Sequence, residues 1–184
     1  MLGIPIGLAY ANLSEWVIHK YVLHGLGKKP GSFWSFHWHE HHKAARRDDL
    51  EDPAYRKSLR ESFRARDAQA KEVAALAASA VAISPLLPVA PWFVGTVWYS
   101  ALNYYRVHKR AHLDPAWARE HLPWHVDHHL GPDQDANWCV TRPWFDDLLG
   151  TRKRYLGTER AAADEAKRAR RAENAAARAA AAAT

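Results

Sequence analysis

Residues 73–105 read VAALAASAVAISPLLPVAPWFVGTVWYSALNYY and contain no charged side chain. About 20 apolar residues suffice for one membrane-spanning helix, so this run is too long for a single span. Pro85, Pro88 and Pro91 interrupt it, and proline ends or kinks a helix. The stretch therefore predicts two short helices that meet at a proline turn, forming a hairpin that dips into the bilayer. A buried hairpin of a soluble helical protein is the alternative, although soluble helices normally show a polar stripe.

The amino-terminal segment is apolar as well. Residues 1–14 carry no charged side chain, and the apolar character continues to Leu23, which is long enough for a first membrane helix. A signal peptide is the alternative, but this start lacks the basic region and the small-residue cleavage site of such peptides. Basic clusters flank both apolar regions, as expected of loops on the cytoplasmic face. We therefore expect the amino terminus outside, and the histidines and the carboxyl terminus in the cytoplasm.

Length and composition indicate one helical domain. The 184 residues carry a formal charge of +6, and the basic residues lie beside apolar segments, which favours a membrane surface over nucleic acid. The single cysteine, Cys139, excludes an internal disulfide and a cysteine-based metal cluster. No alternating strand pattern appears, so the predicted class is all-α. We expect a membrane-embedded helical bundle with a histidine-rich cytoplasmic cap over residues 1–158, and a helical or disordered tail rich in Ala, Arg and Glu over 159–184.

Histidine is the unusual residue of this chain. Ten of its twelve histidines fall into four spaced groups, namely HxxxxH at His19 and His24, HxxxHH at His37, His41 and His42, HxxxH at His108 and His112, and HxxHH at His125, His128 and His129. On an α-helix, HxxxH places two rings on one face about 40° apart, whereas HxxxxH turns the second ring by about 140°. The HxxxxH pair would therefore serve different metals or bracket one from its sides. His39 and His121 lie beside the groups as possible extra ligands.

So many imidazoles predict two metal ions. Imidazole binds iron, zinc, copper and nickel, and one ion accepts roughly four to six ligands. A single histidine would be interpreted as a surface or hydrogen-bonded residue, and one histidine-rich tract as a nonspecific metal buffer. Here apolar helices separate the groups, which favours defined sites. Glu15, Glu40 and Asp127 lie near the groups and are candidates to accept the second ring N–H of a ligand, or are ordinary solvated carboxylates.

The order of these groups, with a proline-marked apolar hairpin between the second and third, resembles the fatty acid hydroxylase and sterol desaturase superfamily. The resemblance covers residues 15–155. The stretch EWVIHKYVLHG at 15–25 looks like the first histidine box of that family. The stretch HHLG at 128–131, followed by NW at 137–138, PWFD at 143–146 and LGT at 149–151, looks like its last box and the motif after it.

This resemblance implies an integral membrane oxidoreductase with a non-haem diiron centre, in which zinc is a possible substitute for iron. Such an enzyme uses O2 and two electrons to hydroxylate or desaturate a lipid. By the same resemblance the ligands are His19, His24, His37, His41, His42, His108, His112, His125, His128 and His129, with an exchange between His37 and His39 left open. The chain has no fused haem domain, so a separate reductase or ferredoxin would deliver the electrons.

The first box and the short length resemble the carotenoid ring hydroxylases, while the ending looks more like the sterol desaturase branch. Acyl, sphingoid, sterol and carotenoid substrates therefore all stay open, because selectivity lies in the shape of an apolar cavity. Trp34, Trp38, Trp98 and Tyr99 are candidates for the wall of the substrate route or for membrane anchors. The competing functions are a membrane zinc hydrolase and a metal-binding or transport protein without catalysis.

Overall fold

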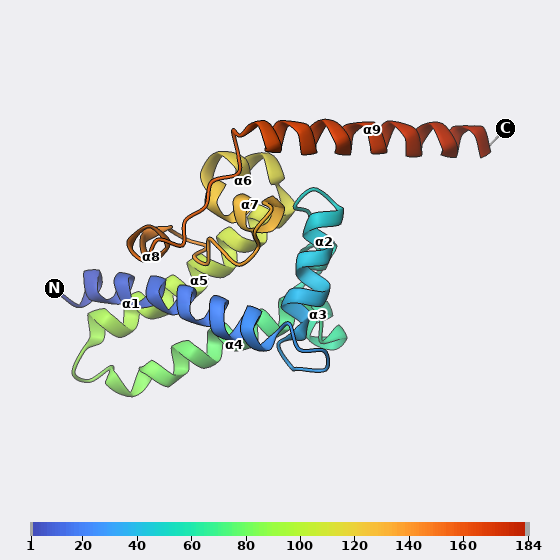
Figure 1. The fold of residues 1–184 in the computed structure, drawn as a ribbon. Helices are drawn as coiled ribbons and strands as arrows, with labels where there is room; N and C mark the ends of the chain where they lie inside the picture. The colour runs from blue at the N-terminus through green and yellow to red at the C-terminus, as the bar shows by residue number, and fades with distance from the viewer. Residues whose placement is uncertain (1, 183–184) are drawn as a thin grey trace.

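The computed structural model describes residues 2–182, and helices connected by turns make up this part of the chain. Three long helices pack together (Figure 1). They are α1 (Gly3–Val17), which continues into the π-helix η1 (Ile18–Leu26), α4 (Ala68–Ile83) and α5 (Pro91–Leu113). No strand occurs in the described residues, so the predicted all-α class is confirmed there.

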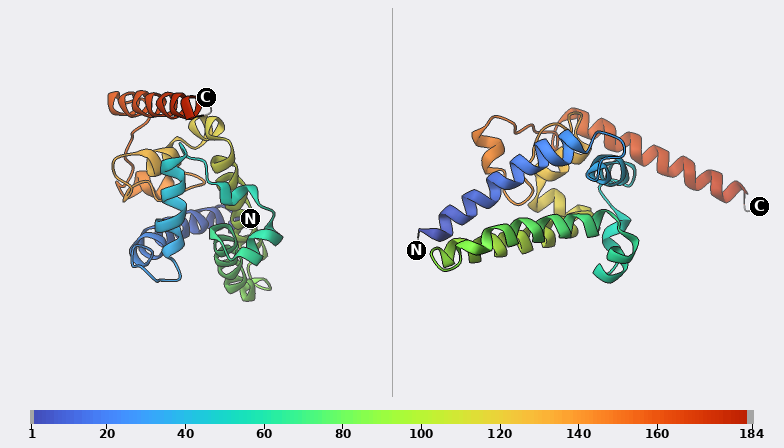
Figure 2. Two further views of the ribbon diagram at one scale, coloured as in Figure 1. Left: turned by 90° about the vertical axis from the view of Figure 1, so that its right-hand side faces the viewer. Right: turned by 90° about the horizontal axis from the view of Figure 1, so that it is seen from below.

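Helices α4 and α5 form the hairpin that the prolines predict. The turn between them includes the short helix η4 (Ser84–Leu86), and Pro91 occupies the first turn of α5, where a missing N–H is tolerated. Helix α1 packs closely along α5. At Gly7 the helices are so close that an added Cβ atom would lie 2.8 Å from Thr96 Cβ. Gly3 meets Phe93 in the same way, so α1 and α5 run in the same direction. The amino terminus and the hairpin turn therefore lie at the same end of the molecule (Figure 2).

This end of the molecule exposes many large apolar side chains. They belong to α1, to the hairpin turn and to the start of α5, and the most exposed are Leu2, Ile6, Leu87, Val89, Trp92 and Tyr99. Among residues 2–182, no helix combines the length and the apolar character needed to cross a bilayer.

Short helices at the other end form a cap. These are η2 (His37–His41), α2 (His42–Arg47), η3 (Pro53–Arg56), α3 (Leu59–Ala65), α6 (Pro115–His121) and α7 (Pro123–Leu130). Helix α8 (Trp144–Leu148) instead packs beside α1 (Figure 1). Leu50, Ala111, Leu122 and Val126 form the centre of the hydrophobic core of the cap. The segment after α7 is fixed by Asp146, a buried residue that accepts hydrogen bonds from the backbone N–H groups of residues 138 and 139 and from the Thr151 hydroxyl.

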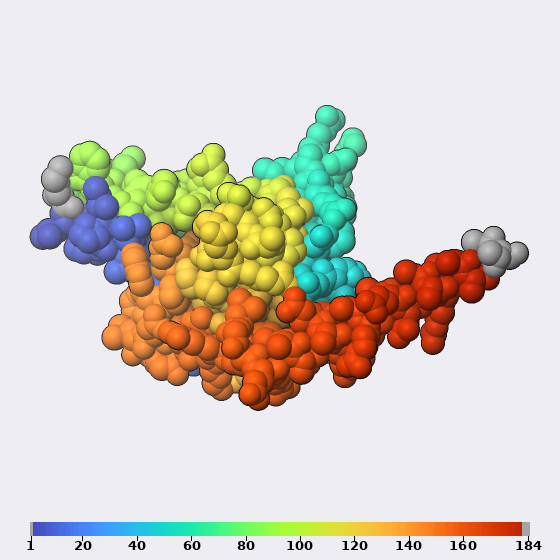
Figure 3. All heavy atoms as spheres, turned by 90° about the horizontal axis from the view of Figure 1, so that it is seen from above, coloured from blue at the N-terminus to red at the C-terminus, as the bar shows by residue number. Residues whose placement is uncertain are grey.

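Residues 159–182 form one helix, α9 (Glu159–Ala182), which extends away from the cap (Figure 1, Figure 3). Its first half rests on the body, where Ala161 is buried and the Arg168 guanidinium lies 3.2 Å from the Asp49 carboxylate. Most of its other side chains are exposed, as expected for a sequence of alanine and charged residues.

Candidate metal centre

Nine buried histidines converge into two adjacent groups. In each group, one ring nitrogen of every member lies within 4.8 Å of the corresponding nitrogens of all the others. The first histidine group contains His19, His24, His37, His42 and His128, and the second contains His41, His108, His112 and His129. A spacing of 4.8 Å or less between nitrogen atoms suits ligands that lie about 2.1 Å from a shared ion. Each group can therefore hold a metal ion.

Two π-helical segments bring together histidines that are five residues apart. Segment η1 carries His19 and His24, which are five residues apart. Segment η2 begins at His37, and His42, again five residues later, comes directly after its end. A π-helix closes hydrogen bonds between residues five apart, so its side chains at this spacing lie on one face. The Nε2 atoms of His37 and His42 are 3.2 Å apart, and His19 Nε2 is 2.9 Å from His37 Nε2. His19 and His24 lie in the same group, so of the two expected arrangements the one that assigns them to different metals does not occur. The 140° turn between the rings does not apply, because it assumed an α-helix.

The second histidine group uses ordinary α-helical spacing. His108 and His112 lie one turn apart on α5, with their Nε2 atoms 3.2 Å from each other. Adjacent histidines are divided between the groups: His41 belongs to the second group and His42 to the first. The pair on α7 divides in the same way, with His128 in the first group and His129 in the second.

Most of these rings present Nε2 to the group and Nδ1 to an oxygen atom outside it. Carbonyl oxygens of Trp138, Leu50 and Ala136 lie 2.6–2.7 Å from Nδ1 of His19, His112 and His128. Side-chain oxygens of Asp52, Glu72, Gln134 and Asp135 lie 2.5–3.2 Å from Nδ1 of His41, His108, His42 and His24. A carbonyl or carboxylate oxygen only accepts, so Nδ1 carries the proton and Nε2 of a neutral ring is left with a lone pair.

The inner nitrogen atoms therefore face one another without a proton between them. His108 and His112 both donate through Nδ1, yet their Nε2 atoms are 3.2 Å apart. His42 and His128 repeat this arrangement, with their Nε2 atoms 3.1 Å apart. In addition, His41 Nε2 is buried without a hydrogen-bond partner among the described residues. Opposed lone pairs repel and buried nitrogens need partners, so the ring arrangement fits a cation in each group.

Burial keeps eight of the nine grouped imidazoles, and the neighbouring His125, neutral and ready to bind a metal. It lowers the pKa of His19 to about 4, although its hydrogen bond to the backbone of Trp138 opposes the shift. Burial also lowers the pKa of His24 and holds the pKa values of His37, His42, His108, His112, His125, His128 and His129 well below the ordinary value. Metal ions bind neutral imidazole, so these rings need not lose a proton at neutral pH.

His125 lies beside the second histidine group. It is buried, its Nε2 is 3.0 Å from His112 Nε2, and its ring centroid is 4.6 Å from that of His129. The resemblance implies His125 as a ligand, but its nitrogens do not lie within 4.8 Å of those of all four members of the second histidine group. Its Nδ1 is buried without a partner among residues 2–182.

His39 and His121, the possible extra ligands, lie outside both groups. The His39 ring points to the backbone oxygen of Lys28, 3.2 Å away, so the exchange of His39 for His37 does not occur. His121 is exposed and stacks on Trp117, with ring centroids 4.8 Å apart. His39 lies two residues from both His37 and His41, and His121 ends α6, whereas His125, His128 and His129 lie on α7.

The three acidic residues considered as partners of the ligand rings, Glu15, Glu40 and Asp127, contact other groups instead. Glu15 accepts hydrogen bonds from the backbone N–H groups of Val140 and Thr141 and from the Thr141 hydroxyl. Asp127 is buried and pairs with Arg152, and Glu40 is exposed with its carboxylate 4.0 Å from the Lys71 ammonium. No ring N–H donates to any of the three among the described residues, whereas the alternative of a solvated carboxylate holds for Glu40.

The acidic partners of the rings come instead from other segments. Asp52 follows α2, Asp135 follows α7, and Glu72 stands directly before the uncharged run of residues 73–105. The position of Glu72 was the one available signal, because a carboxylate at the edge of an apolar helix needs a polar partner.

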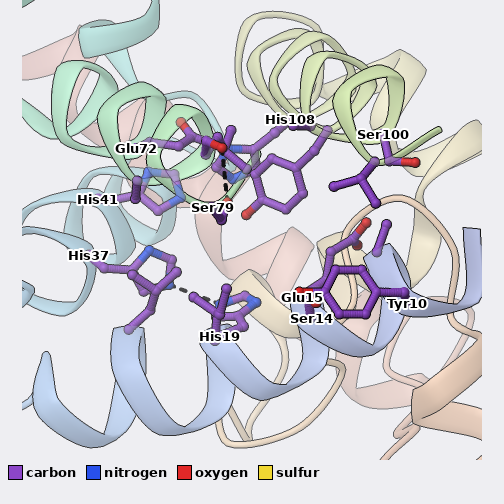
Figure 4. Close-up of a pocket in the computed structure, with 18 of the residues that line it drawn as sticks. Tyr10, Ser14, Glu15, His19, His37, His41, Glu72, Ser79, Ser100 and His108 are labelled. Carbon is purple, nitrogen blue, oxygen red and sulfur yellow. Dashed lines mark hydrogen bonds and ion pairs between the residues drawn. The ribbon is translucent and has the colours of Figure 1, made fainter. Parts of the chain in front are cut away.

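A cavity between α1, α4 and α5 leads to both histidine groups (Figure 4). His19 and His37 of the first group and His41 and His108 of the second line its inner end. Its walls are mainly apolar, with side chains that include Ile18, Leu23, Phe36, Leu76 and Val97.

None of the four aromatic residues named as candidates for the wall of this route or for membrane anchors lines the cavity. Trp98 is exposed and donates a hydrogen bond to Ser84, and Tyr99 is exposed on the far side of α5. Trp38 packs against the His24 ring, and Trp34 also lies outside the cavity wall. Tyr10, Phe36, Tyr55 and Tyr104 provide the aromatic lining instead.

Comparison with known proteins adds no relative: no family model, no curated protein and no solved structure matches this chain.

Proposed function

We propose that this protein is an O2-dependent oxidoreductase that hydroxylates or desaturates a lipid chain, with one iron ion in each histidine group. One observation carries the proposal: two adjacent groups of buried imidazoles aim unprotonated nitrogens at two centres, and the same apolar cavity reaches both. The order of the four histidine boxes supports placing the chain in the fatty acid hydroxylase and sterol desaturase superfamily.

A pair of iron ions would supply the oxidising power needed to break an unactivated C–H bond with O2. The chain's own residues do the rest. Ile18, Leu76 and Val97 hold an apolar chain in the cavity, and Phe36 helps to exclude water at its inner end. Asp52 and Glu72 fix the rings of His41 and His108, which keeps the second centre in one geometry.

The exposed apolar end is proposed to insert into a membrane from one side. Leu2, Ile6, Leu87, Val89 and Trp92 are each more than half exposed there, which is costly in water over so large a surface. The amino terminus and the hairpin turn lie together at this end, so both would enter the same leaflet. The histidine cap would face the cytoplasm, where a separate protein donates electrons, and lipids would reach the cavity between α1, α4 and α5 from the bilayer.

The decisive experiment counts metal and follows oxygen. Protein purified in detergent from iron-replete cells should contain about two irons per chain, and a variant with both His42→Ala and His129→Ala should contain almost none. Reduced protein incubated with ¹⁸O2 and membrane lipids from the cells that produce it should yield a lipid labelled with ¹⁸O, or one that has lost two hydrogens. The double variant should yield neither.

Two results would overturn the proposal. Less than about one iron per chain, with zinc in its place and lipid cleavage that proceeds without O2, would indicate a zinc hydrolase. Two bound irons without any O2-dependent product from membrane lipids, in the presence of an efficient reductant, would indicate a protein that holds metal without catalysis.

A further inference from the structure

Tyr104 has a largely buried side chain, and its hydroxyl has no hydrogen-bond partner among the described residues. The residue lies on α5, one turn before His108, and its side chain is more than nine-tenths buried at 8% exposure. It lines the cavity that leads to the histidine groups, and its ring centroid is 5.4 Å from that of His108. Tyrosines with largely buried side chains normally find a hydrogen-bond partner for the hydroxyl, so a group bound in the cavity is the available partner here.

Further polar groups line the same part of the cavity. Ser14 on α1 and Ser100 on α5 also have hydroxyls without a hydrogen-bond partner in the described part of the chain. Glu15 lies between them, with its carboxylate held by Val140 and Thr141. Figure 4 shows Ser14, Glu15 and Ser100 together at one end of the cavity, with His37 and His41 at the other. Hydroxyls from two helices therefore lie within a mainly apolar wall.

A pure hydrocarbon in the cavity would leave the Tyr104 hydroxyl without a hydrogen-bond partner. A site built to hydrogen-bond an oxygen atom discriminates strongly against an analogue that lacks it, because its buried polar groups then lose their partners. We therefore propose that the substrate already carries a hydroxyl or carbonyl oxygen, which binds to the Tyr104 hydroxyl beside Ser14 and Ser100. This inference rests on the proposed function, and it narrows the substrate class from any lipid chain to an oxygenated one.

The position of Tyr104 also sets where that oxygen sits. One turn of α5, about 6 Å, separates it from His108, and the π-helical segment carrying His19 begins just after Ser14 and Glu15. The oxygen of the substrate is thus held a few carbon atoms away from the carbon that faces the histidine groups. The product would carry two functional groups a short distance apart.

Binding to the zinc-loaded protein tests this inference without turnover. The probes are tritiated 1-hexadecanol and tritiated hexadecane, which differ by one oxygen, and the protein is kept in detergent. For each probe, the dissociation constant of the Tyr104→Phe variant is divided by that of the wild type, so that partition into micelles cancels. We expect binding of the alcohol to weaken about fivefold, as for the loss of one hydrogen bond, and binding of the hydrocarbon to stay the same.

Tyr99→Phe is the matched control, because this tyrosine lies on the same helix, is 62% exposed and is outside the cavity. It should change neither constant. Zinc content and thermal stability of each variant show whether it has folded. An unchanged alcohol affinity in Tyr104→Phe, or an equal loss for both probes, would overturn the inference.

The outcome is separable from that of the proposed function. If the alcohol preference depends on Tyr104 but the iron-loaded protein oxidises no lipid, the oxygen-binding point stands and the oxidase proposal fails. If the protein binds two irons and incorporates ¹⁸O into lipid, but Tyr104→Phe changes the affinity for both probes equally, the proposed oxidase function is supported and this inference fails.

Discussion

The Nδ1 atom of His41 lies 2.7 Å from a carboxylate oxygen of Asp52, and both side chains are almost completely buried. The other carboxylate oxygen of Asp52 accepts from the backbone N–H of Ala54. In Asp52→Asn only one oxygen remains for these two donors, so the His41 ring loses its fixed orientation. We expect the affinity of the second histidine group for zinc to fall roughly 10- to 100-fold, as for other outer partners of metal ligands. Competition with a chromogenic chelator measures it.

Asp48→Asn is the control for that variant. Asp48 pairs with Arg47 at the surface and touches no histidine ring by any hydrogen bond among residues 2–182. Its zinc affinity should equal that of the wild type. If Asp52→Asn binds both ions as tightly as Asp48→Asn, Asp52 does not orient His41.

The two histidine groups should be separable by mutation. His24→Ala removes a ligand of the first group, and His112→Ala removes one of the second. Each variant should bind about one ion at micromolar metal in place of two, because the other group keeps its full set. Elemental analysis after gel filtration measures the stoichiometry.

His39→Ala is the control, since this ring points away to the backbone of Lys28. It should retain both ions. A stoichiometry of two in both His24→Ala and His112→Ala would mean that the rings do not form two sites.

The metal-free protein should lose stability in mild acid. Burial lowers the pKa of His19 from 6.5 to about 4, and that of eight further histidines in the same direction. Below pH 6.5 the unfolded chain takes up protons that the folded rings refuse, so stability falls as the pH drops from 6.5 towards 4. Each ring contributes about 1.4 kcal/mol per pH unit, and a few rings are enough to exceed the stability of an ordinary domain.

Two carboxyls act in the opposite direction. Burial raises the pKa values of Glu15 and Glu72 to about 7, so their contribution is lost as the pH rises through 7. Nine histidines outweigh them, and we expect the chelated protein to unfold between pH 6 and about 5. Urea titrations at pH 7.5, 6.5 and 5.5 check this. Equal stability at all three values would mean that the rings are charged or exposed in the folded protein.

The hairpin turn should bind lipid bilayers. Leu87 and Val89 are 52% and 80% exposed at the turn, and burying each in a bilayer gains about 1.5–3 kcal/mol. A Leu87→Ser, Val89→Ser double variant should co-sediment with phosphatidylcholine vesicles at least tenfold less than the wild type. Phe63→Ser, which alters a residue 50% exposed on α3 of the cap, should co-sediment like the wild type. Equal loss in both variants would indicate adsorption without a defined inserting surface.

Glu15 should matter for stability through its hydrogen bonds. Glu15→Ala leaves the N–H groups of Val140 and Thr141 without their acceptor and should cost roughly 2–4 kcal/mol of unfolding free energy. Glu15→Gln keeps one oxygen for both N–H groups and offers an N–H to the Thr141 hydroxyl, so its cost should be under about 1 kcal/mol. Chemical denaturation of the zinc-loaded protein measures both. Similar losses in the two variants would show that the charge, and not the hydrogen bonds, holds α1 to this segment.

Helix class, the proline hairpin and the convergence of most histidines followed from sequence patterns. Residue type and spacing are local properties, and HxxxH at His108 and His112 needs only α-helical geometry to bring two rings together. The placement of His24 beside His19 could not be predicted in this way, because π-helices are rare and α-helical geometry is the default expectation for such a segment.

The oxygen atoms that hold the rings were equally hidden. Leu50, Ala136 and Trp138 present backbone carbonyls, which every residue type possesses, so no pattern marks them. Asp52 and Glu72 reach their histidines across 11 and 36 positions, a distance set by tertiary packing. Glu15 seemed a better candidate because it stands near His19 in the chain, but its carboxylate is engaged by the segment at Val140.

His41 and His42 are neighbours, as are His128 and His129, and each pair divides its members between the two groups. An ion bound in one group therefore restrains the same short backbone segments that carry ligands of the other group. The first ion to arrive would stiffen η2 and α7, so the second would lose less conformational freedom on binding. Filling of the two positions would then be cooperative, and singly loaded molecules would be scarce during titration of the wild type.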